Sequence, residues 1–368
     1  MVAKILLILV VLVFPQQLFG DARISSEIST MGILQWIDDE GWSFNGDARG
    51  TLDVRSPAGS NVQARLQLRF STLELINAVE KIIDNDNDNG NSAAEQQLIK
   101  SLFPLGIVQV PRAYLRFRFP VTDDFSLRVT SGIDRVTWGV GSVLNAGDLI
   151  FKADPDNNAG LLTFDEVRDE TAMLFAFYAP LGQLNFLETV VLPVVDEVPR
   201  AGIRLYSAFE QFSLESSYLY DGPASEHAVA VSLQRSLFGA DVYTGVSLQG
   251  DFSDSDSIKE GFTITGGGIY SWRIGYDQQI SARIEAMVRP GSDSLLKLYG
   301  DIGYVPNRTV QLILRGMTEP EKQWDSSLMV GANWNIFQGF HIQGAVLSMF
   351  NQQGFTSETI TAGFNYRF

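Results

Sequence analysis

Arg112 to Phe119 reads Arg-Ala-Tyr-Leu-Arg-Phe-Arg-Phe, with apolar and polar side chains in alternation. One set of alternate positions holds Ala113, Leu115, Phe117 and Phe119, and the other holds Arg112, Tyr114, Arg116 and Arg118. Successive side chains of a β-strand point to opposite faces, so this stretch predicts a strand with one apolar and one polar face. The same period of two recurs at residues 62–70, 296–304 and 310–315. The pattern predicts an all-β chain.

Alternating segments of this kind extend over residues 23–368. We place eighteen strands, with sixteen as the alternative count, at 23–37, 42–56, 61–72, 106–120, 124–138, 170–180, 183–194, 199–208, 211–221, 227–237, 241–252, 261–272, 276–289, 294–305, 308–318, 325–337, 340–351 and 355–368. Connections after even strands are short, whereas those after odd strands include long acidic loops at 73–105 and 139–169. Short turns at one end and long loops at the other are typical of transmembrane, antiparallel up-and-down β-barrels.

The N-terminal residues 1–22 have the layout of a secretory signal peptide. Lys4 precedes the apolar run 5–14, and Gly20-Asp21-Ala22 is a small-x-small cleavage site. Ten apolar residues are too few to span a bilayer as a helix, which disfavours the alternative of a retained anchor. We therefore expect cleavage after Ala22, with Gly20 as second choice, and export across the inner membrane.

The C-terminal strand ends in Phe-Asn-Tyr-Arg-Phe, which puts Phe364, Tyr366 and Phe368 on one face. This ending resembles the closing strand of bacterial outer-membrane barrels. The resemblance implies an outer-membrane location, contact with lipid, and recognition of these aromatic residues by the barrel assembly machinery. The alternative is a periplasmic β-domain whose last residue is aromatic.

Residues 134–148 carry a narrower resemblance. Trp138-Gly-Val-Gly141, followed by Asn145 and Asp148, is similar to a strand-to-loop stretch of several porin-like barrel families. Those families often have Pro after the Asn, where this chain has Ala146. The resemblance therefore implies the class of barrel and leaves the solute open.

Eight arginines occupy the polar faces of strands two to five. An Arg facing lipid at mid-membrane costs about 2–4 kcal/mol, so we expect all eight to line the interior as a basic wall. Two neighbouring acids, Asp47 and Asp53, are expected to pair with part of it. The predicted pore-lining residues are Arg49, Arg55, Arg65, Arg69, Arg112, Arg116, Arg118 and Arg128.

The loop 139–169 follows this wall directly and carries both acids and apolar stretches. A structureless loop of this length is often functional. We expect it to fold into the lumen, with its acids opposing the arginines across a constriction, as in the layout of general porins. The predicted acids are Asp148, Asp154, Asp156, Asp165 and Glu166. The alternative is a salt-bridged wall that fills the barrel.

Loop 73–105 holds a candidate calcium site between flanks with helical spacing. Asp84, Asp86, Asp88 and Glu95 stand at positions 1, 3, 5 and 12 of an EF-hand loop, the spacing that wraps oxygens around Ca²⁺. Asn89 occupies the sharp-turn position, with Gly90 one residue late. The alternative is a solvated Asp/Asn-rich loop, and no other cofactor is expected.

The predicted function is passive diffusion of small polar solutes through the barrel. The formal charge of −16 argues against a nucleic-acid partner, because phosphate binding needs an excess of Lys and Arg. An adhesion or structural barrel without an open pore is the alternative. An outer-membrane hydrolase is less favoured and rests on His227 beside Glu226 and near Asp221. A homotrimer is expected only because it is common among large pores.

Overall fold

The computed structural model describes residues 22–38, 41–57, 61–71, 108–122, 125–151, 170–194, 197–254, 261–291, 295–320 and 325–368. Within these ranges the chain forms eighteen β-strands and no helix. The strands are β1 (Arg23–Ile37), β2 (Gly41–Arg55), β3 (Val62–Ser71), β4 (Val108–Thr122), β5 (Phe125–Asp134), β6 (Ala172–Pro180), β7 (Phe186–Leu192), β8 (Arg200–Ala208), β9 (Ser213–Asp221), β10 (Glu226–Leu237), β11 (Ala240–Gly250), β12 (Thr263–Arg273), β13 (Gln279–Val288), β14 (Leu296–Asn307), β15 (Val310–Glu319), β16 (Asp325–Phe337), β17 (Phe340–Asn351) and β18 (Gly354–Arg367).

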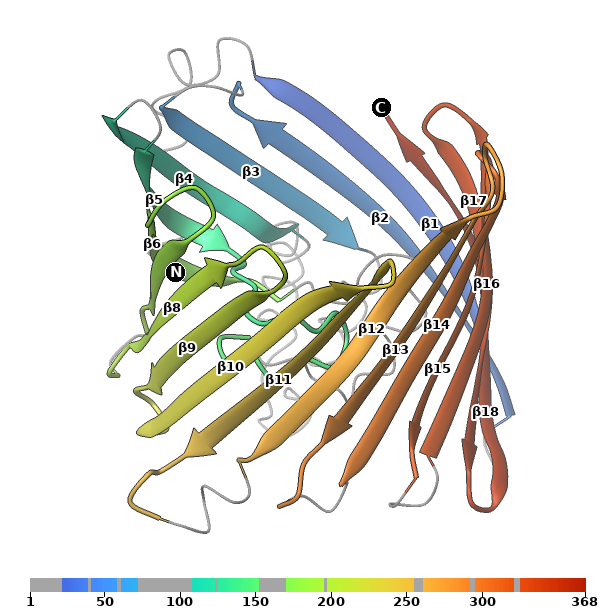
Figure 1. Cartoon of the computed structure of the whole chain (residues 1–368). Coiled ribbons are helices and arrows are strands. Elements are labelled where there is room, and N and C mark those ends of the chain that lie inside the picture. The colour runs from blue at the N-terminus through green and yellow to red at the C-terminus, as the bar shows by residue number, and fades with distance from the viewer. Residues whose placement is uncertain are drawn as a thin grey trace, which may run out of the picture.

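Each strand pairs antiparallel with its neighbours in the sequence, and β1 pairs with both β2 and β18. This last pairing closes the sheet into a barrel, as Figure 1 shows. The prediction of an antiparallel barrel with eighteen strands is confirmed, and the alternative count of sixteen is wrong. Loop 73–105, with its predicted helical flanks, and the predicted signal peptide up to residue 21 lie outside the described residues.

Several strands are shorter than the sequence predicts, most of all the fifth and the seventh. The sequence extends the fifth strand to residue 138, but β5 ends at Asp134 because the backbone then turns into the barrel. The seventh strand is predicted to reach residue 194, but β7 ends at Leu192. Its next residue, Pro193, has no N–H to donate to a neighbouring strand. Within the described residues, no helix is long and apolar enough to cross a membrane.

Strand β13 shows how the period of two sets the faces of the barrel. Its outward positions are Ile280, Ala282, Ile284, Ala286 and Val288, and its inward positions are Gln279, Ser281, Arg283, Glu285 and Met287. Ile284 is 70% exposed on the outer surface, whereas the next residue, Glu285, is 0% exposed inside. Apolar side chains thus cover the outside and polar ones gather inside.

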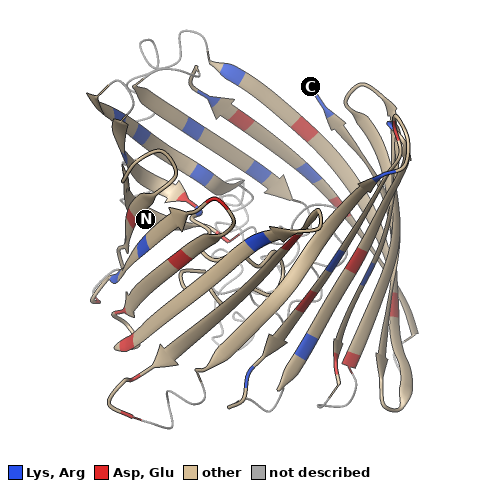
Figure 2. Cartoon of the chain, viewed as in Figure 1, with Lys and Arg blue, Asp and Glu red and all other residues tan. Residues whose placement is uncertain are grey.

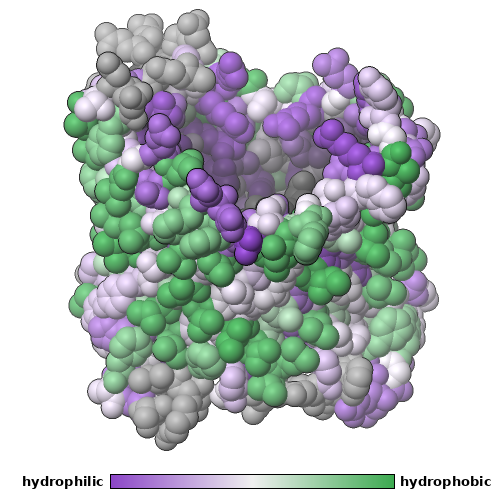
Figure 3. All heavy atoms as spheres, in the orientation of Figure 1, coloured by the Kyte–Doolittle hydropathy of each residue, from purple (hydrophilic) through white to green (hydrophobic). Residues whose placement is uncertain are grey.

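The two ends of the barrel differ. The turns after even-numbered strands and the C-terminus lie at one end, called the short-turn end below; four of these turns have only two residues. The opposite, long-loop end carries the connections after odd-numbered strands. In Figure 3 a hollow lined by hydrophilic residues opens at the short-turn end, and hydrophobic residues gather on the visible outer surface. The interior of the barrel is therefore the place to look for a functional site.

Candidate functional site

Residues 135–151, called the inner segment below, leave β5 and run through the interior of the barrel (Figure 1). Two apolar clusters hold this segment against the wall. In the first, Trp138, Leu149 and Ile150 pack on inward side chains of β6, β7, β9 and β10, and in the second Leu144 packs on those of β13 to β17. Burying each such side chain stabilises the arrangement by about 1.5–3 kcal/mol. The segment therefore covers the inward face of β6–β17, called the covered side below.

Glu285 on β13 binds the tip of the inner segment. Its carboxylate accepts hydrogen bonds from the backbone N–H groups of Ser142 (3.0 Å), Val143 (2.9 Å) and Leu144 (2.5 Å). The hydroxyl of Tyr243 on β11 also donates to it. Successive N–H groups in a turn form a concavity that binds anions, and here the anion is a buried carboxylate of the wall. Hydrogen bonds to charged groups contribute about 1.5–3 kcal/mol each.

A second pair of carboxylates binds the start of the inner segment. The indole Nε1 of Trp138 donates to Glu188 on β7 at 3.0 Å, and the N–H of Gly139 donates to Glu215 on β9 at 2.5 Å. Arg204 on β8 lies between these carboxylates, 2.7 Å from Glu188 and 3.3 Å from Glu215. Its guanidinium also donates to the carbonyl of Thr137 at 3.0 Å. One cation and two carboxylates thus fix the point at which the chain turns inward.

The Trp-Gly-x-Gly motif supplies the shape that these contacts need. Gly139 has φ +79°, and a Cβ there would lie 2.2 Å from Oδ1 of Asn145. Asn145 closes the loop, because its Nδ2 donates to the carbonyl of Trp138 (2.8 Å) and its Oδ1 accepts from the N–H of Gly147 (2.9 Å). Gly202 on β8 gives the indole room, since a Cβ there would come within 2.6 Å of the Trp138 ring. Only glycine therefore fits at these close approaches.

Ala146, where the resembling motif often has Pro, also has a structural role. The N–H of Ala146 donates to Oγ1 of Thr265 on β12 at 3.4 Å. Proline has no N–H, so this contact to the covered side requires another residue. Ala146 thus adds one anchor to a segment that Glu285 and the apolar clusters already hold.

The arginines predicted from the sequence occupy the inward face of β2–β5, called the arginine side below. The strand register places all eight inward, together with three aspartates, Asp47, Asp53 and Asp134. Charged residues recur along β2, β3 and β4 in Figure 2. The aspartates bind arginines of this side: Asp47 pairs with Arg49, Asp53 with Arg55 (2.5 Å) and Arg65 (2.7 Å), and Asp134 with Arg112 (3.9 Å) and Arg116 (3.5 Å). The pairing expected for Asp47 and Asp53 is present, whereas Asp134 was not foreseen.

The cations of the arginine side reach further into water than its anions. The side chain of Arg55 is 48% exposed and that of Arg49 is 43% exposed, whereas the partner carboxylates of both are buried. Arg128 lies with its guanidinium 3.7 Å from the ring centre of Tyr178, and Arg118 is directly opposite it across the strands. The arginine side thus presents guanidinium groups to the lumen.

The predicted constriction acids are only partly within the described residues. Asp148 is buried in the inner segment, 3.1 Å from Arg135 of that same segment. Its charge is therefore balanced inside the segment, contrary to the expectation that it faces the arginine wall. Asp154, Asp156, Asp165 and Glu166 lie outside the described residues, as do the candidate calcium ligands Asp84, Asp86, Asp88 and Glu95. Within the described part of the chain, no group of three or more potential metal ligands occurs.

The His–acid pair proposed for a hydrolase does not form. His227 and Glu226 are neighbours on β10 and point to opposite faces, because side chains alternate along a strand. His227 lies outward, 2.8 Å from the hydroxyl of Tyr218, whereas Glu226 lies inward and accepts from Gln249. Asp221 binds Arg200 at 2.9 Å. The contacts of His227 on the outer surface are aromatic, with rings of Tyr218, Tyr220 and Phe252 around it.

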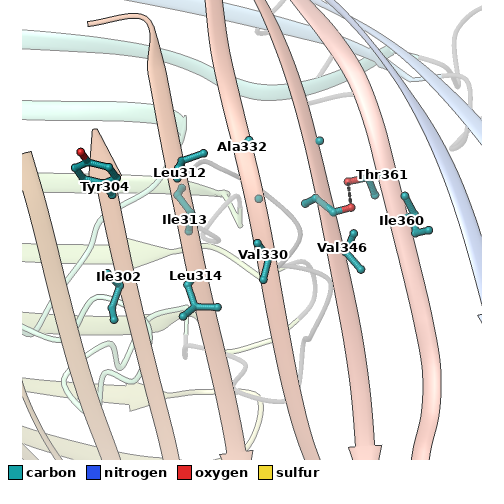
Figure 4. A pocket seen from close by; sticks show the side chains of 13 residues that line it. Ile302, Tyr304, Leu312, Ile313, Leu314, Val330, Ala332, Val346, Ile360 and Thr361 are labelled. Atoms are coloured by element: carbon teal, nitrogen blue, oxygen red, sulfur yellow. Dashed lines mark hydrogen bonds between the residues drawn. The ribbon is translucent and has the colours of Figure 1, made fainter. Parts of the chain in front are cut away.

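An apolar groove lies on the barrel wall at β14–β18 (Figure 4). Outward side chains such as Ile302, Leu312 and Val346 border it, and the small residues Ala332 and Gly344 leave it open. The hydroxyl of Thr361, on the inward face, donates to the carbonyl of Ala345 at 3.4 Å. The groove belongs to the apolar outer surface and is separate from the lumen.

Sequence reasoning missed the carboxylates that hold the inner segment. Glu188, Glu215 and Glu285 sit at inward positions that the alternation does predict. A partial signal exists at Glu188, whose inward neighbours on β7, Phe186 and Val190, are apolar. The partners carry no such signal, because most of them are backbone N–H groups of a loop.

Comparison with solved structures finds porins from Rhodopseudomonas blastica. One variant with three substitutions is 11% identical, with a TM-score of 0.49, and the match covers 94% of this chain and 100% of the porin. A second such variant is 11% identical with a TM-score of 0.48 at the same coverage. No family model and no curated protein matches the chain. The likeness concerns barrel architecture and assigns no specific family.

Proposed function

We propose that this chain is a passive channel of the bacterial outer membrane, through which small polar solutes diffuse along the barrel lumen. One observation carries the proposal. The inner segment is bound to the covered side, whereas the side chains of Arg49 and Arg55 on the arginine side remain 43% and 48% exposed. If folded chain filled the whole lumen, the inward side chains of the arginine side would be as buried as those of the covered side.

The outer surface supports placement in a bilayer. Most outward positions in mid-strand are apolar, and aromatic clusters lie near both ends: Phe337, Phe340 and Tyr366 at the short-turn end, and Trp36 and Phe355 at the long-loop end. Strand β17 has twelve residues. At about 3.3 Å per residue and a tilt of about 40°, such a strand spans roughly 30 Å, which matches a bilayer core. Aromatic girdles flanking an apolar band are typical of outer-membrane barrels.

The chain ends support the same route. Phe364, Tyr366 and Phe368 lie outward at the end of the last strand, where we propose that the barrel assembly machinery reads them. Cleavage of residues 1–22 on export belongs to this proposal. A homotrimer is also part of it, and the mass of the detergent-solubilised complex tests that element.

The inner segment sets the width of the path. Because it is anchored at Glu188, Glu215 and Glu285, it narrows the lumen from one side only. We propose that solutes pass between it and the arginine side, where opposed fixed charges order water and favour polar solutes. The acids Asp154, Asp156, Asp165 and Glu166 are proposed to complete the opposing wall.

Single-channel recording tests this function. The refolded full-length barrel, added to a planar bilayer in KCl, is expected to insert in discrete conductance steps and to let small sugars swell proteoliposomes. Folding is checked by the shift in electrophoretic mobility on boiling. A correctly folded barrel that gives neither steps nor swelling overturns the proposal in favour of a closed structural or adhesion barrel.

A further inference from the structure

Arginines stand directly opposite one another at the short-turn end of the lumen. Arg23 of β1 faces Arg55 of β2, and Arg55 faces Arg65 of β3. Two strands further on, Arg118 of β4 faces Arg128 of β5. Like charges directly opposite each other destabilise a sheet. The fold thus carries a local electrostatic cost at one mouth of the barrel.

The aspartate in this row compensates it in part. Asp53 binds Arg55 and Arg65 at 2.5 and 2.7 Å, so its carboxylate pairs with two of the three guanidinium groups in this row. The Asp53 side chain is only 8% exposed and that of Arg55 is 48% exposed, so this row presents the guanidinium rather than the carboxylate to the lumen. An incoming anion is the group that would relieve the remaining repulsion.

The opposite wall does not offset this field in mid-lumen, although it is rich in acids. Glu188, Glu215 and Glu285 are bound to the inner segment. Three further inward acids pair with cations of the same wall: Asp221 with Arg200, Asp301 with Arg283 and Glu319 with Lys297. The inward acids Glu226 and Asp325 lie at the long-loop end, and Asp241 at the short-turn end accepts a hydrogen bond from the hydroxyl of Ser236 at 2.6 Å. The carboxylates along the middle of the covered side are therefore engaged.

We propose that the short-turn mouth binds small oxyanions, such as carboxylates and phosphate, and makes the channel anion-selective. This inference rests on the proposed function. The binding residues are Arg23, Arg55, Arg65, Arg118 and Arg128. A guanidinium presents a planar fork of N–H donors that matches oxyanions in two-point hydrogen bonding. Low-dielectric walls lined by one sign of charge raise the local concentration of counter-ions.

The test is the reversal potential of the full-length channel in a KCl gradient, followed by addition of inorganic phosphate. We expect the reversal potential to shift toward the equilibrium potential of chloride, and we expect phosphate to decrease the chloride current. Neutralising Arg55, Arg118 and Arg128 to Gln together is expected to lower the anion-to-cation permeability ratio about threefold or more, and to weaken the phosphate effect. The triple Lys variant keeps the charge and is expected to keep chloride preference while binding phosphate less well.

Arg308→Gln is the matched control. Arg308 lies in the turn between β14 and β15 at the same end of the barrel, outside the lumen, where it pairs with Asp277 at 2.7 Å. This variant is expected to behave as wild type. Cation preference of the wild-type channel, or chloride preference without any phosphate effect, overturns the inference while leaving the channel function intact. Absence of conductance would instead overturn the proposed function itself.

Discussion

The arginine side and the covered side of the lumen share one strand geometry and differ in what satisfies their charges. On the arginine side, carboxylates of the wall bind guanidinium groups of the wall, and some of these cations, such as Arg49 and Arg55, stay exposed. On the covered side, three carboxylates reach across to the inner segment, and that segment buries the wall. Inward charge therefore has two uses in one barrel. On the covered side, inward carboxylates bind N–H donors of the inner segment. On the arginine side, inward guanidinium groups face water.

Removing Glu285 is expected to have the largest effect on the difference between the two sides. Glu285→Ala leaves three backbone N–H groups and the Tyr243 hydroxyl without their acceptor. At about 1–3 kcal/mol for each unsatisfied group, we expect the anchored state to lose about 5 kcal/mol and the inner segment to detach. Single-channel recording is expected to show larger and noisier steps.

Glu226→Ala is the control for this change. Glu226, at the start of β10, also lies inward, but its carboxylate accepts a hydrogen bond from Gln249 of β11 and not from the inner segment. Its conductance is expected to equal that of wild type. Quiet, wild-type steps from Glu285→Ala would show that the apolar clusters alone hold the segment.

Removing the indole of Trp138 is expected to have the next largest effect. Trp138 is fully buried against the covered side. Trp138→Ala is expected to lower the free energy of unfolding by about 3–5 kcal/mol, as measured by urea titration of the refolded barrel in detergent micelles. The outward Trp334→Ala is expected to cost less, since detergent already surrounds that ring. Equal losses would contradict the packing of Trp138 inside the lumen.

Two glycines with positive φ differ in the space around them. Gly139 has φ +79° and no room for a Cβ, whereas Gly182 in the turn after β6 has φ +125° and open space around it. Gly139→Ala is expected to destabilise the barrel by about 2 kcal/mol or more, because overpacking adds to the strain. Gly182→Ala is expected to cost less, about 1 kcal/mol, in the same urea titration. The reverse order would argue against the closed loop at Asn145.

The smallest expected effect concerns Thr265. Thr265→Val removes the acceptor of the Ala146 N–H and is expected to cost about 1 kcal/mol. The Ala146→Pro change is expected to cost less in the Thr265→Val background than in wild type, since the contact is then already lost. Additive losses in this double-mutant cycle would mean that the two residues do not interact.

The barrel itself could be predicted because period-two alternation persists along the chain. On β13, for example, the residue types of Ile284 and Glu285 are enough to indicate which face is outer and which is inner. The inward positions of all eight arginines follow from the same rule. The end of β5 could not be placed by alternation, because Trp138 continues the alternating pattern after the backbone has left the sheet.

The anchoring of the inner segment could not be predicted from sequence. Glu188, Glu215 and Glu285 are far from residues 138–144 along the chain, and only barrel closure brings them together. The ion pair of Asp148 could not be predicted either. Arg135, a cation of the same loop, lies 3.1 Å from it, and alternation gives no information about pairing within a loop.

The proposed channel requires that alternate residues of the strands line a conducting, water-filled interior. The chain has no cysteine, so single cysteines can be placed at the neighbouring positions Val54 and Arg55 of β2. A water-soluble, charged thiol reagent added to the open channel is expected to change the conductance of Arg55→Cys and to leave Val54→Cys unaffected. A change at Val54→Cys, or an unmodified thiol at Arg55→Cys in a folded and inserted barrel, would contradict the account.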